Sequence, residues 1–296
     1  MLDRMRKSIA TMLTSAASNQ AGAALGAHAF GAIGPAGVVA VRQIVAAAVL
    51  LPIARPPLRR FTWAQWWPTL LLALVFATMN LSLYTAVDRL GLGPAVTLEV
   101  LGPLAVGLIG SRTVRDAGCA VAAALGVYVL ILPGPASDVL GVAAGLLAAG
   151  CWASYIMLNR LLGVRLPGLQ APAAATTVSA VVYLPVLVAL IAQGRLGWAP
   201  LAYAVGAGLF SSVVPYAADL LVLRSVAPRM FGLFMSVHPV LAALAGLILL
   251  GQRLDLHECL GMAVVVAANA VAVQARTATV AQSERAYTFR ERSTLI

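Results

Sequence analysis

Ionisable and polar side chains interrupt several long apolar stretches of this chain, and they are the residues that could do chemistry. In LEVLGPLAVGLIGSR, residues 98–112, the carboxylate of Glu99 lies among apolar residues and the next charge is Arg112. A charge at the centre of a membrane helix costs about 2.5–3.5 kcal/mol on insertion scales. Such residues therefore face a hydrated cavity or a partner, and they are candidate functional groups. The candidates for substrate binding or ion coupling are Arg42, Glu99, Asp219, His238, Asn80 and Tyr84.

Arg42 and Glu99 carry opposite charges, and we expect them at the same depth in the membrane. Each lies about six or seven residues into a helix that starts from the same side, which places both roughly 10 Å below that surface. One interpretation is a structural ion pair that joins two helices. The alternative is a pair of binding groups, in which Glu99 binds an ammonium group or carries a proton and Arg42 binds a carboxylate.

The other candidates lie near prolines or at helical spacing. Asp219 follows a proline by one turn, and proline kinks a helix and frees a backbone carbonyl, although Asp219 could instead pair with a loop arginine. His238 precedes Pro239 within an apolar span and is either a hydrogen-bonded packing residue or a proton carrier. Asn80 and Tyr84 are spaced i, i+4, so they either bind substrate or form hydrogen bonds between helices.

The composition indicates which kind of protein must position these residues. Hydrophobic residues make up 61% of the 296 positions and charged residues only 10%, whereas a soluble domain carries about 25% charged residues. The chain is therefore predicted to be an all-α integral membrane protein. The net charge of +10 is spread singly between apolar runs without a basic face, which argues against a nucleic-acid partner. The sequence contains no metal-ligand spacing or phosphate-binding loop, so we expect no cofactor.

Apolar runs of about 20 residues, the length needed to cross a bilayer, divide the chain into ten predicted transmembrane helices. Their approximate ranges are 9–31, 35–54, 65–87, 93–110, 115–132, 139–159, 171–192, 199–223, 230–250 and 257–275. With the N-terminus in the cytoplasm, 16 Lys and Arg residues fall in inner segments and 3 in outer loops, with Arg42 inside a span. This bias predicts a plasma (inner) membrane protein with both termini cytoplasmic. A cleaved signal peptide at the N-terminus is the alternative for the first span.

The two halves of the chain resemble each other. MNLSLYTAVDRL (79–90) aligns with VPYAADLLVLRS (214–225), and GPLAVGLIGSR (102–112) aligns with HPVLAALAGLI (238–248), both at an offset of about 135 residues. Because each half has five helices, the second copy must be inserted in the opposite orientation. Inverted repeats are typical of secondary transporters with a substrate site near the midplane.

The predicted organisation follows from this repeat. It comprises a cytoplasmic N-terminus (1–8), a first five-helix repeat (9–132), a second five-helix repeat (139–275) and a cytoplasmic tail (276–296).

Several stretches, in order along nearly the whole membrane domain, carry a family resemblance. They are GPAGVVAVRQ (34–43), MNLSLYTAVDRLGLGPAVTLEVLGPLAV (79–106), GLLAAGCWASYIMLNR (145–160), VVPYAADLLVLRSVAPRMFGLFMSVHPVLAALAGLILLGQRL (213–254) and LGMAVVVAANA (260–270). The chain resembles the EamA family of the drug/metabolite transporter superfamily, and within it the threonine/homoserine exporter (RhtA) group. The resemblance implies ten helices in two inverted units, a central cavity, and ion-driven efflux of small amino acids.

The resemblance also bears on the candidate residues. Arg42, Glu99 and Asp219 fall on positions that match the family, whereas two positions depart from it. His238 replaces a glutamate before the proline of the ninth span, and Gln252 replaces an acidic residue at the outer end of that span. If a carboxylate at the position of His238 is needed for coupling, this protein couples transport differently.

The functional hypothesis is a secondary exporter of small amino acids such as threonine and homoserine, driven by proton antiport. A broader metabolite or drug exporter on the same scaffold is the alternative. A membrane-embedded enzyme would need a catalytic constellation, and the sequence contains no HExxH or GxSxG motif. The absence of a Walker sequence disfavours an ATP-driven pump.

Overall fold

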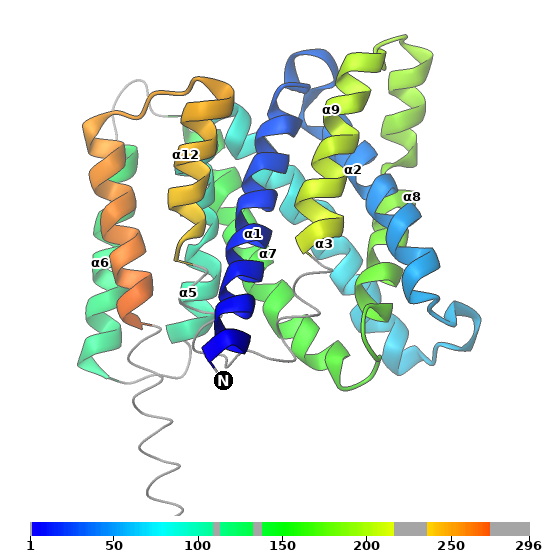
Figure 1. Ribbon diagram of the computed structural model, residues 1–296, viewed down its shortest axis with the longest axis horizontal. Coiled ribbons are helices and arrows are strands. Elements are labelled where there is room, and N and C mark those ends of the chain that lie inside the picture. The colour runs from blue at the N-terminus through cyan, green and yellow to red at the C-terminus, as the bar shows by residue number, and fades with distance from the viewer. Residues whose placement is uncertain (1, 109–112, 133–137, 216–235, 273–296) are drawn as a thin grey trace, which may run out of the picture.

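The computed structural model describes residues 2–108, 113–132, 138–215 and 236–272, and these residues form a bundle of helices (Figure 1). In chain order the elements are α1 (Leu2–Ala27), α2 (Phe30–Ala54), the short 3-10 helix η1 (Leu58–Arg60), α3 (Trp63–Leu90), α4 (Leu92–Glu99), α5 (Leu101–Leu108), α6 (Val114–Ile131), α7 (Val139–Gly163), α8 (Gln170–Ala192), α9 (Trp198–Gly208), the π-helical segment η2 (Leu209–Val213) and α12 (His238–Leu250). A last helix, Leu256–Ala272, has no label.

The length and composition of these helices confirm a multi-pass membrane protein. Five of them are long and apolar enough to cross a bilayer, namely α2, α3, α6, α7 and α8, and shorter apolar helices cover Leu92–Val106, Trp198–Val213, His238–Leu250 and Leu256–Ala272. Large apolar side chains such as Ile248, Leu74 and Val188 are more than half exposed on the outside of the bundle. In water this surface would be unfavourable, and in a bilayer it faces lipid.

Helices overlap the predicted ranges, but several boundaries differ. α1 begins at Leu2 rather than at residue 9, and the predicted span 93–110 is divided at Val100 into α4 and α5. The connection between α1 and α2 lies at residues 28–29, inside the predicted span 9–31, because α1 ends at Ala27 and α2 begins at Phe30. Gly34, with a φ of 69°, kinks α2 directly before Pro35, which is where the sequence placed the helix start. Of the predicted spans 199–223 and 230–250, residues 216–235 lie outside the described part of the chain.

Local sequence signals explain where several helices begin and end. The Thr113 hydroxyl accepts a hydrogen bond from the backbone N–H of Asp116 and caps α6, and the Asp138 carboxylate caps α7 through the N–H of Gly141. α2 ends where Arg55 adopts a left-handed conformation ahead of two prolines. Side-chain caps satisfy the N–H groups that the first helical turn leaves free.

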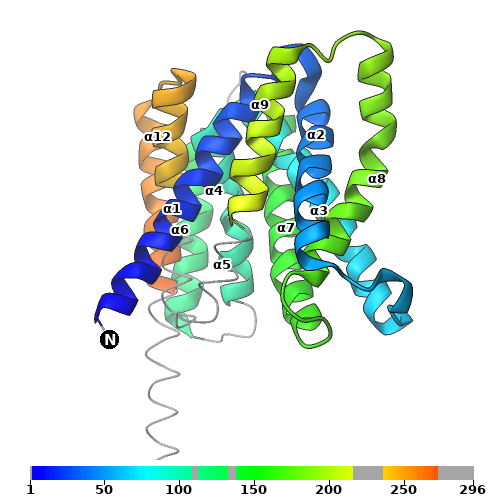
Figure 2. The same ribbon diagram turned by 45° about the vertical axis from the view of Figure 1, so that its right-hand side comes forward.

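The bundle is arranged so that α1 crosses in front of the other helices, with α12 on one side of it and α9 on the other (Figures 1 and 2). α3 packs against α7, α2 packs against α8, and α4 packs against α12. The largest apolar core draws buried residues from α1, α2, α3, α4, α7, α8, α9 and α12. Segments from both halves of the chain therefore surround the centre, where the candidate residues of α2 and α3 are buried.

A second contact joins α6 to the last helix at the far side of the bundle. Gly126 and Gly261 face each other there, and a Cβ on Gly261 would overlap the backbone of Leu130. Small residues let membrane helices approach to backbone contact. A small apolar cluster also joins these two helices and α5, and it includes Leu104, Cys119 and Ala268.

Candidate functional site

Arg42 is a buried arginine of α2, and neutral groups hold its guanidinium. Its side chain is 7% exposed. Nε donates a hydrogen bond to the Ser212 hydroxyl at 2.8 Å, and Nη2 donates to the Ser211 carbonyl oxygen at 2.8 Å. No carboxylate pairs with Arg42 among the residues that the structure describes. The guanidinium is therefore fixed in position and keeps a positive charge that a ligand can use.

The sequence around η2 explains why these acceptors are available. Pro215 has no N–H, so it cannot donate the α-helical hydrogen bond to the carbonyl of Ser211, four residues earlier. That carbonyl accepts from Arg42 instead. η2 is a π-helical segment, and single turns of this kind often occur at functional sites. The Ser211 hydroxyl also donates to the Asn19 carbonyl at 2.7 Å, which ties η2 to α1.

Tyr84 lies beside Arg42 at the centre of the bundle. The Arg42 Cζ is 5.4 Å from the centroid of the Tyr84 ring, and the edge of Phe30 packs against the same ring. Tyr84 is completely buried, and its hydroxyl has no hydrogen-bond partner in the described residues. A Cβ added to Gly26 of α1 would approach that hydroxyl to 3.1 Å. A buried hydroxyl without a partner is rare in proteins, and this one lies beside a buried charge.

Glu99 is the last residue of α4 and is 7% exposed. Pro103 cannot donate to the Glu99 carbonyl, and α4 stops here before α5 begins at Leu101. The Arg42 charge acts on the Glu99 carboxylate, and the Cys151 thiol of α7 lies within the electrostatic reach of Glu99. No ion pair joins Glu99 to Arg42 in the described chain. The two charges thus share one region of the bundle without a direct contact.

The close approach of α5 to α7 holds this break in place. A Cβ on Gly102 would overlap the carbonyl oxygen of Ala149, and a Cβ on Gly145 would come within 2.9 Å of the Leu98 Cβ. Glycine at these positions lets the segment around Glu99 lie directly on α7.

His238 is the first residue of α12 and contacts neutral side chains. Its Nδ1 lies 3.2 Å from the amide nitrogen of Gln20 on α1, and Trp152 of α7 packs edge-on against its ring at 5.9 Å between centroids. The sequence placed His238 in the middle of span 230–250, whereas the described part of this span is a helix that starts at His238. His238 thereby connects α1, α7 and α12.

Asn80 and Tyr84 share one face of α3, as their spacing predicted, but their polar groups differ in hydrogen bonding. The Asn80 amide nitrogen donates to the Phe76 carbonyl of its own helix at 2.6 Å, and Gln43 of α2 donates to the same carbonyl at 3.3 Å. Asn80 is thus bonded within its helix, while the Tyr84 hydroxyl has no partner among the residues that the structure describes. Asp219 lies outside the described residues.

Ser211, Ser212 and Gln20 also belong to this region, and they were not among the residues predicted from the sequence. A serine pair four residues before a proline is a signal that could have indicated the first two, because such a carbonyl has lost its helical donor. Gln252, noted above as a departure, has a structural role. Its side-chain oxygen accepts from the N–H of Leu92 at 2.9 Å and caps α4, and a carboxylate could accept the same bond.

The described residues contain no group of His, Cys, Asp and Glu side chains that could hold a metal ion. Two pockets, of about 420 and 300 Å³, lie away from Arg42 and Glu99, at the turn between α2 and α3 and between α2 and α8. The arrangement around Arg42 offers a fixed cation, a carboxylate and a hydroxyl without a partner in the described part of the chain, and such groups can recognise a small charged molecule.

Comparisons with known proteins show the family to which this chain belongs. Residues 139–274 match the EamA-like transporter family. The threonine/homoserine exporters RhtA of Escherichia coli (strain K12) and Salmonella typhimurium (strain LT2) are each 31% identical to this chain over 264 residues, which cover 88% of this chain and 89% of theirs. A solved crystal structure with 18% identity covers 90% of this chain and 96% of its own, with a TM-score of 0.60, so it shares the fold. The chain belongs to the EamA-like transporter family.

Proposed function

We propose that this protein exports small amino acids such as threonine and homoserine across the inner membrane in exchange for protons. One observation carries the proposal: a buried arginine held by neutral groups and a buried glutamate at a helix break lie in one region of the bundle. An amino acid is a zwitterion, and it needs one cationic and one anionic group in its binding site. The similarity to named threonine/homoserine exporters supports the same substrate class.

In this proposal Arg42 binds the carboxylate of the substrate. A guanidinium can bind a carboxylate through two parallel hydrogen bonds. Nε and Nη2 of Arg42 are occupied by Ser212 and Ser211, and no acceptor among the described residues holds Nη1, which is therefore assigned to the substrate. The Tyr84 hydroxyl supplies a further donor or acceptor beside it.

Glu99 binds the ammonium group of the substrate and also carries the proton. A single carboxylate cannot hold both, so protonation from one side releases the amino acid, and substrate binding from the other side displaces the proton. Competition for one carboxylate is sufficient to couple the two fluxes. Asp219 and His238 are further candidates for coupling, and Asn80 is a further candidate for substrate binding.

The proposed topology has ten helices in two inverted five-helix units, 9–132 and 139–275, with both termini in the cytoplasm. The excess of arginine in the predicted inner segments supports this orientation. The family match over residues 139–274 has nearly the bounds of the proposed second unit. Helix breaks near the middle of the bundle, at Val100 and at η2, are typical of transporter sites.

The test is transport by the purified protein in proteoliposomes with Glu99→Gln. The wild type should accumulate threonine and homoserine against a gradient when a proton gradient is imposed, and counterflow should depend on external pH. Glu99→Gln should lose the proton-driven accumulation and raise the KM for threonine at least about tenfold, because a charge-assisted hydrogen bond is lost.

The matched control is Glu258→Gln, which removes a carboxylate at the start of the last helix, where Glu258 caps the N–H of Asp255. This variant should transport as the wild type does. Proton-driven accumulation at the wild-type level in Glu99→Gln would remove Glu99 from the mechanism. If a panel of other metabolites were transported and threonine were not, the substrate class would be wrong.

A further inference from the structure

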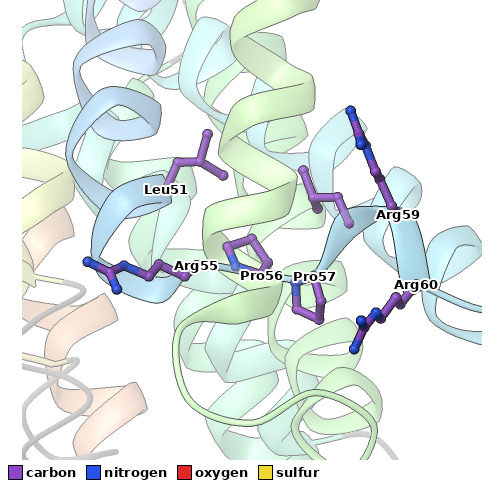
Figure 3. A pocket seen from close by; sticks show the side chains of 7 residues that line it. Leu51, Arg55, Pro56, Pro57, Arg59 and Arg60 are labelled. Atoms are coloured by element: carbon purple, nitrogen blue, oxygen red, sulfur yellow. The ribbon is translucent and has the colours of Figure 1, made fainter.

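The turn between α2 and α3 carries three arginines around a pocket of about 420 Å³. The pocket is lined by Leu51, Arg55, Pro56, Pro57, Leu58, Arg59 and Arg60. In Figure 3 the two prolines lie between Arg55 on one side and Arg59 and Arg60 on the other. All three arginines are exposed, and none forms an ion pair with a carboxylate of the described chain. The turn therefore presents a concentration of positive charge to its surroundings.

The shape of this turn is fixed by its sequence. Arg55 has a left-handed backbone with a φ of 43°, and its Nε donates to the carbonyl of Pro52 at 3.2 Å. Two consecutive prolines follow, which restrict the backbone, and η1 holds Leu58 to Arg60 in a helical turn. A rigid turn loses little conformational entropy when it binds a ligand.

An apolar groove begins where this pocket ends. A second pocket of about 300 Å³ runs between α2 and α8, and it is lined by Ile44, Ala47, Ala48, Leu51, Pro52, Thr177, Ala180, Val181 and Leu184. Leu51 lines both pockets. From Leu51 to Ile44 the groove follows α2 for about 10 Å, at 1.5 Å per residue. Val181 and Leu184 of α8 are 59% and 44% exposed, so the groove opens toward lipid.

The aromatic residues after the turn mark the level of the membrane surface. Trp63, at the start of α3, is 73% exposed. Tryptophan is enriched at the boundary between the headgroups and the acyl chains. The arginine-lined pocket thus lies at the headgroup level, and the groove leads from it into the hydrocarbon region.

We propose that the turn between α2 and α3 and the groove between α2 and α8 together bind one anionic phospholipid. The phosphate lies at the arginine-lined pocket, where Arg59 and Arg60 turn toward it from the separate directions in which Figure 3 shows them, and an acyl chain lies in the groove past Leu51. A guanidinium binds phosphate more specifically than a diffuse positive potential does, and basic pockets beside membrane helices bind anionic headgroups. The site is separate from Arg42 and Glu99, so it does not depend on the identity of the transported substrate.

The headgroup half of the site is tested by native mass spectrometry of the purified full chain titrated with phosphatidylglycerol or phosphatidylcholine. The wild type should bind one phosphatidylglycerol in preference to phosphatidylcholine. Arg59→Gln/Arg60→Gln should weaken phosphatidylglycerol binding at least about tenfold, the loss expected for one hydrogen bond to a charged group. The control, Arg115→Gln/Arg160→Gln, removes two exposed charges from the ends of α6 and α7 that are predicted to face the same side, and it should change the affinity less than twofold.

The acyl-chain half is tested by filling the groove. Ala48 is exposed within the groove, and Ala48→Trp should weaken the binding of both lipids, whereas Ala124→Trp on the exposed face of α6 should not. Equal losses in the two arginine double variants, or equal binding of the two lipids by the wild type, would overturn the proposal. Complete displacement of phosphatidylglycerol by excess glycerol phosphate, with no effect of Ala48→Trp, would show a soluble-anion site and would also overturn it.

Discussion

Ser212→Ala tests whether the π-helical segment positions Arg42 for substrate. The substitution removes the acceptor of the Arg42 Nε–H, a 2.8 Å bond between two buried groups. Hydrogen bonds to charged groups contribute about 1.5–3 kcal/mol, which corresponds to roughly 10- to 150-fold in an equilibrium constant. The bond from Nη2 to the Ser211 carbonyl and the contact with the Tyr84 ring remain. Because two of three contacts persist, we expect an effect near the lower end of this range.

Two measurements separate positioning from stability alone. In proteoliposomes the KM for threonine should rise about tenfold in Ser212→Ala, since Arg42 loses its fixed orientation, and Tm in detergent should fall. The matched control is Ser154→Ala, whose hydroxyl is exposed and donates to the Gly150 carbonyl of its own helix. If Ser212→Ala had the KM of Ser154→Ala, the reasoning that assigns the substrate carboxylate to Arg42 would be refuted, whatever the change in Tm.

Two further predictions concern the frame around the site. Gly102→Ala should destabilise the protein by about 1–3 kcal/mol, the cost of overpacking, because the new methyl group would overlap the α7 backbone. The control Gly150→Ala, whose new methyl group would have no atom within 4 Å, should raise Tm. A wild-type Tm in Gly102→Ala would contradict the close packing. The Asp138 carboxyl, which caps α7, has its pKa held below its usual value by the backbone hydrogen bond from that cap and by Arg89. Its contribution to stability is therefore complete above the unfolded pKa near 4 and is lost as the pH falls through the lower folded pKa, so Tm measured between pH 6 and pH 3 should fall more steeply for the wild type than for Asp138→Asn.

The burial of Arg42 and Glu99 could be predicted from the sequence because charge is expensive in an apolar span. Both residues are buried in one region of the bundle, where the Arg42 charge acts on Glu99. The sequence left open whether Arg42 and Glu99 form an ion pair or bind a ligand separately. Arg42 donates to Ser211 and Ser212 instead, and this depends on a π-helical segment. Pro215 marks the Ser211 carbonyl as an available acceptor, but no sequence signal shows that Arg42, 169 positions earlier, is its donor.

Some helix boundaries are marked by local sequence, whereas others depend on contacts between distant residues. The Gly34–Pro35 pair correctly marked a break, but residues 30–33 are helical before it, because the chain turns already at residues 28–29. The role of Gln252 was not visible in the sequence, since the N–H that it caps belongs to Leu92, 160 positions earlier. Contacts of this range depend on the assembled bundle.

Prolines affect the backbone hydrogen bonding at both charged positions, and this matters for the proposed binding of a zwitterion. Pro215 leaves the Ser211 carbonyl without its helical donor, and Arg42 uses that carbonyl. Pro103 leaves the Glu99 carbonyl without its donor in the same way, one residue before α4 gives way to α5. An ammonium group has three donors, and the Glu99 carbonyl, which lacks the donor of a regular α-helix, could accept one of them beside the carboxylate. In the proposed mechanism Glu99 thus offers the substrate both its carboxylate and its own backbone oxygen, whereas a proton needs only the carboxylate. Substrate and proton would then compete for the Glu99 carboxylate, and the additional backbone oxygen would increase the affinity for the amino acid but not for the proton.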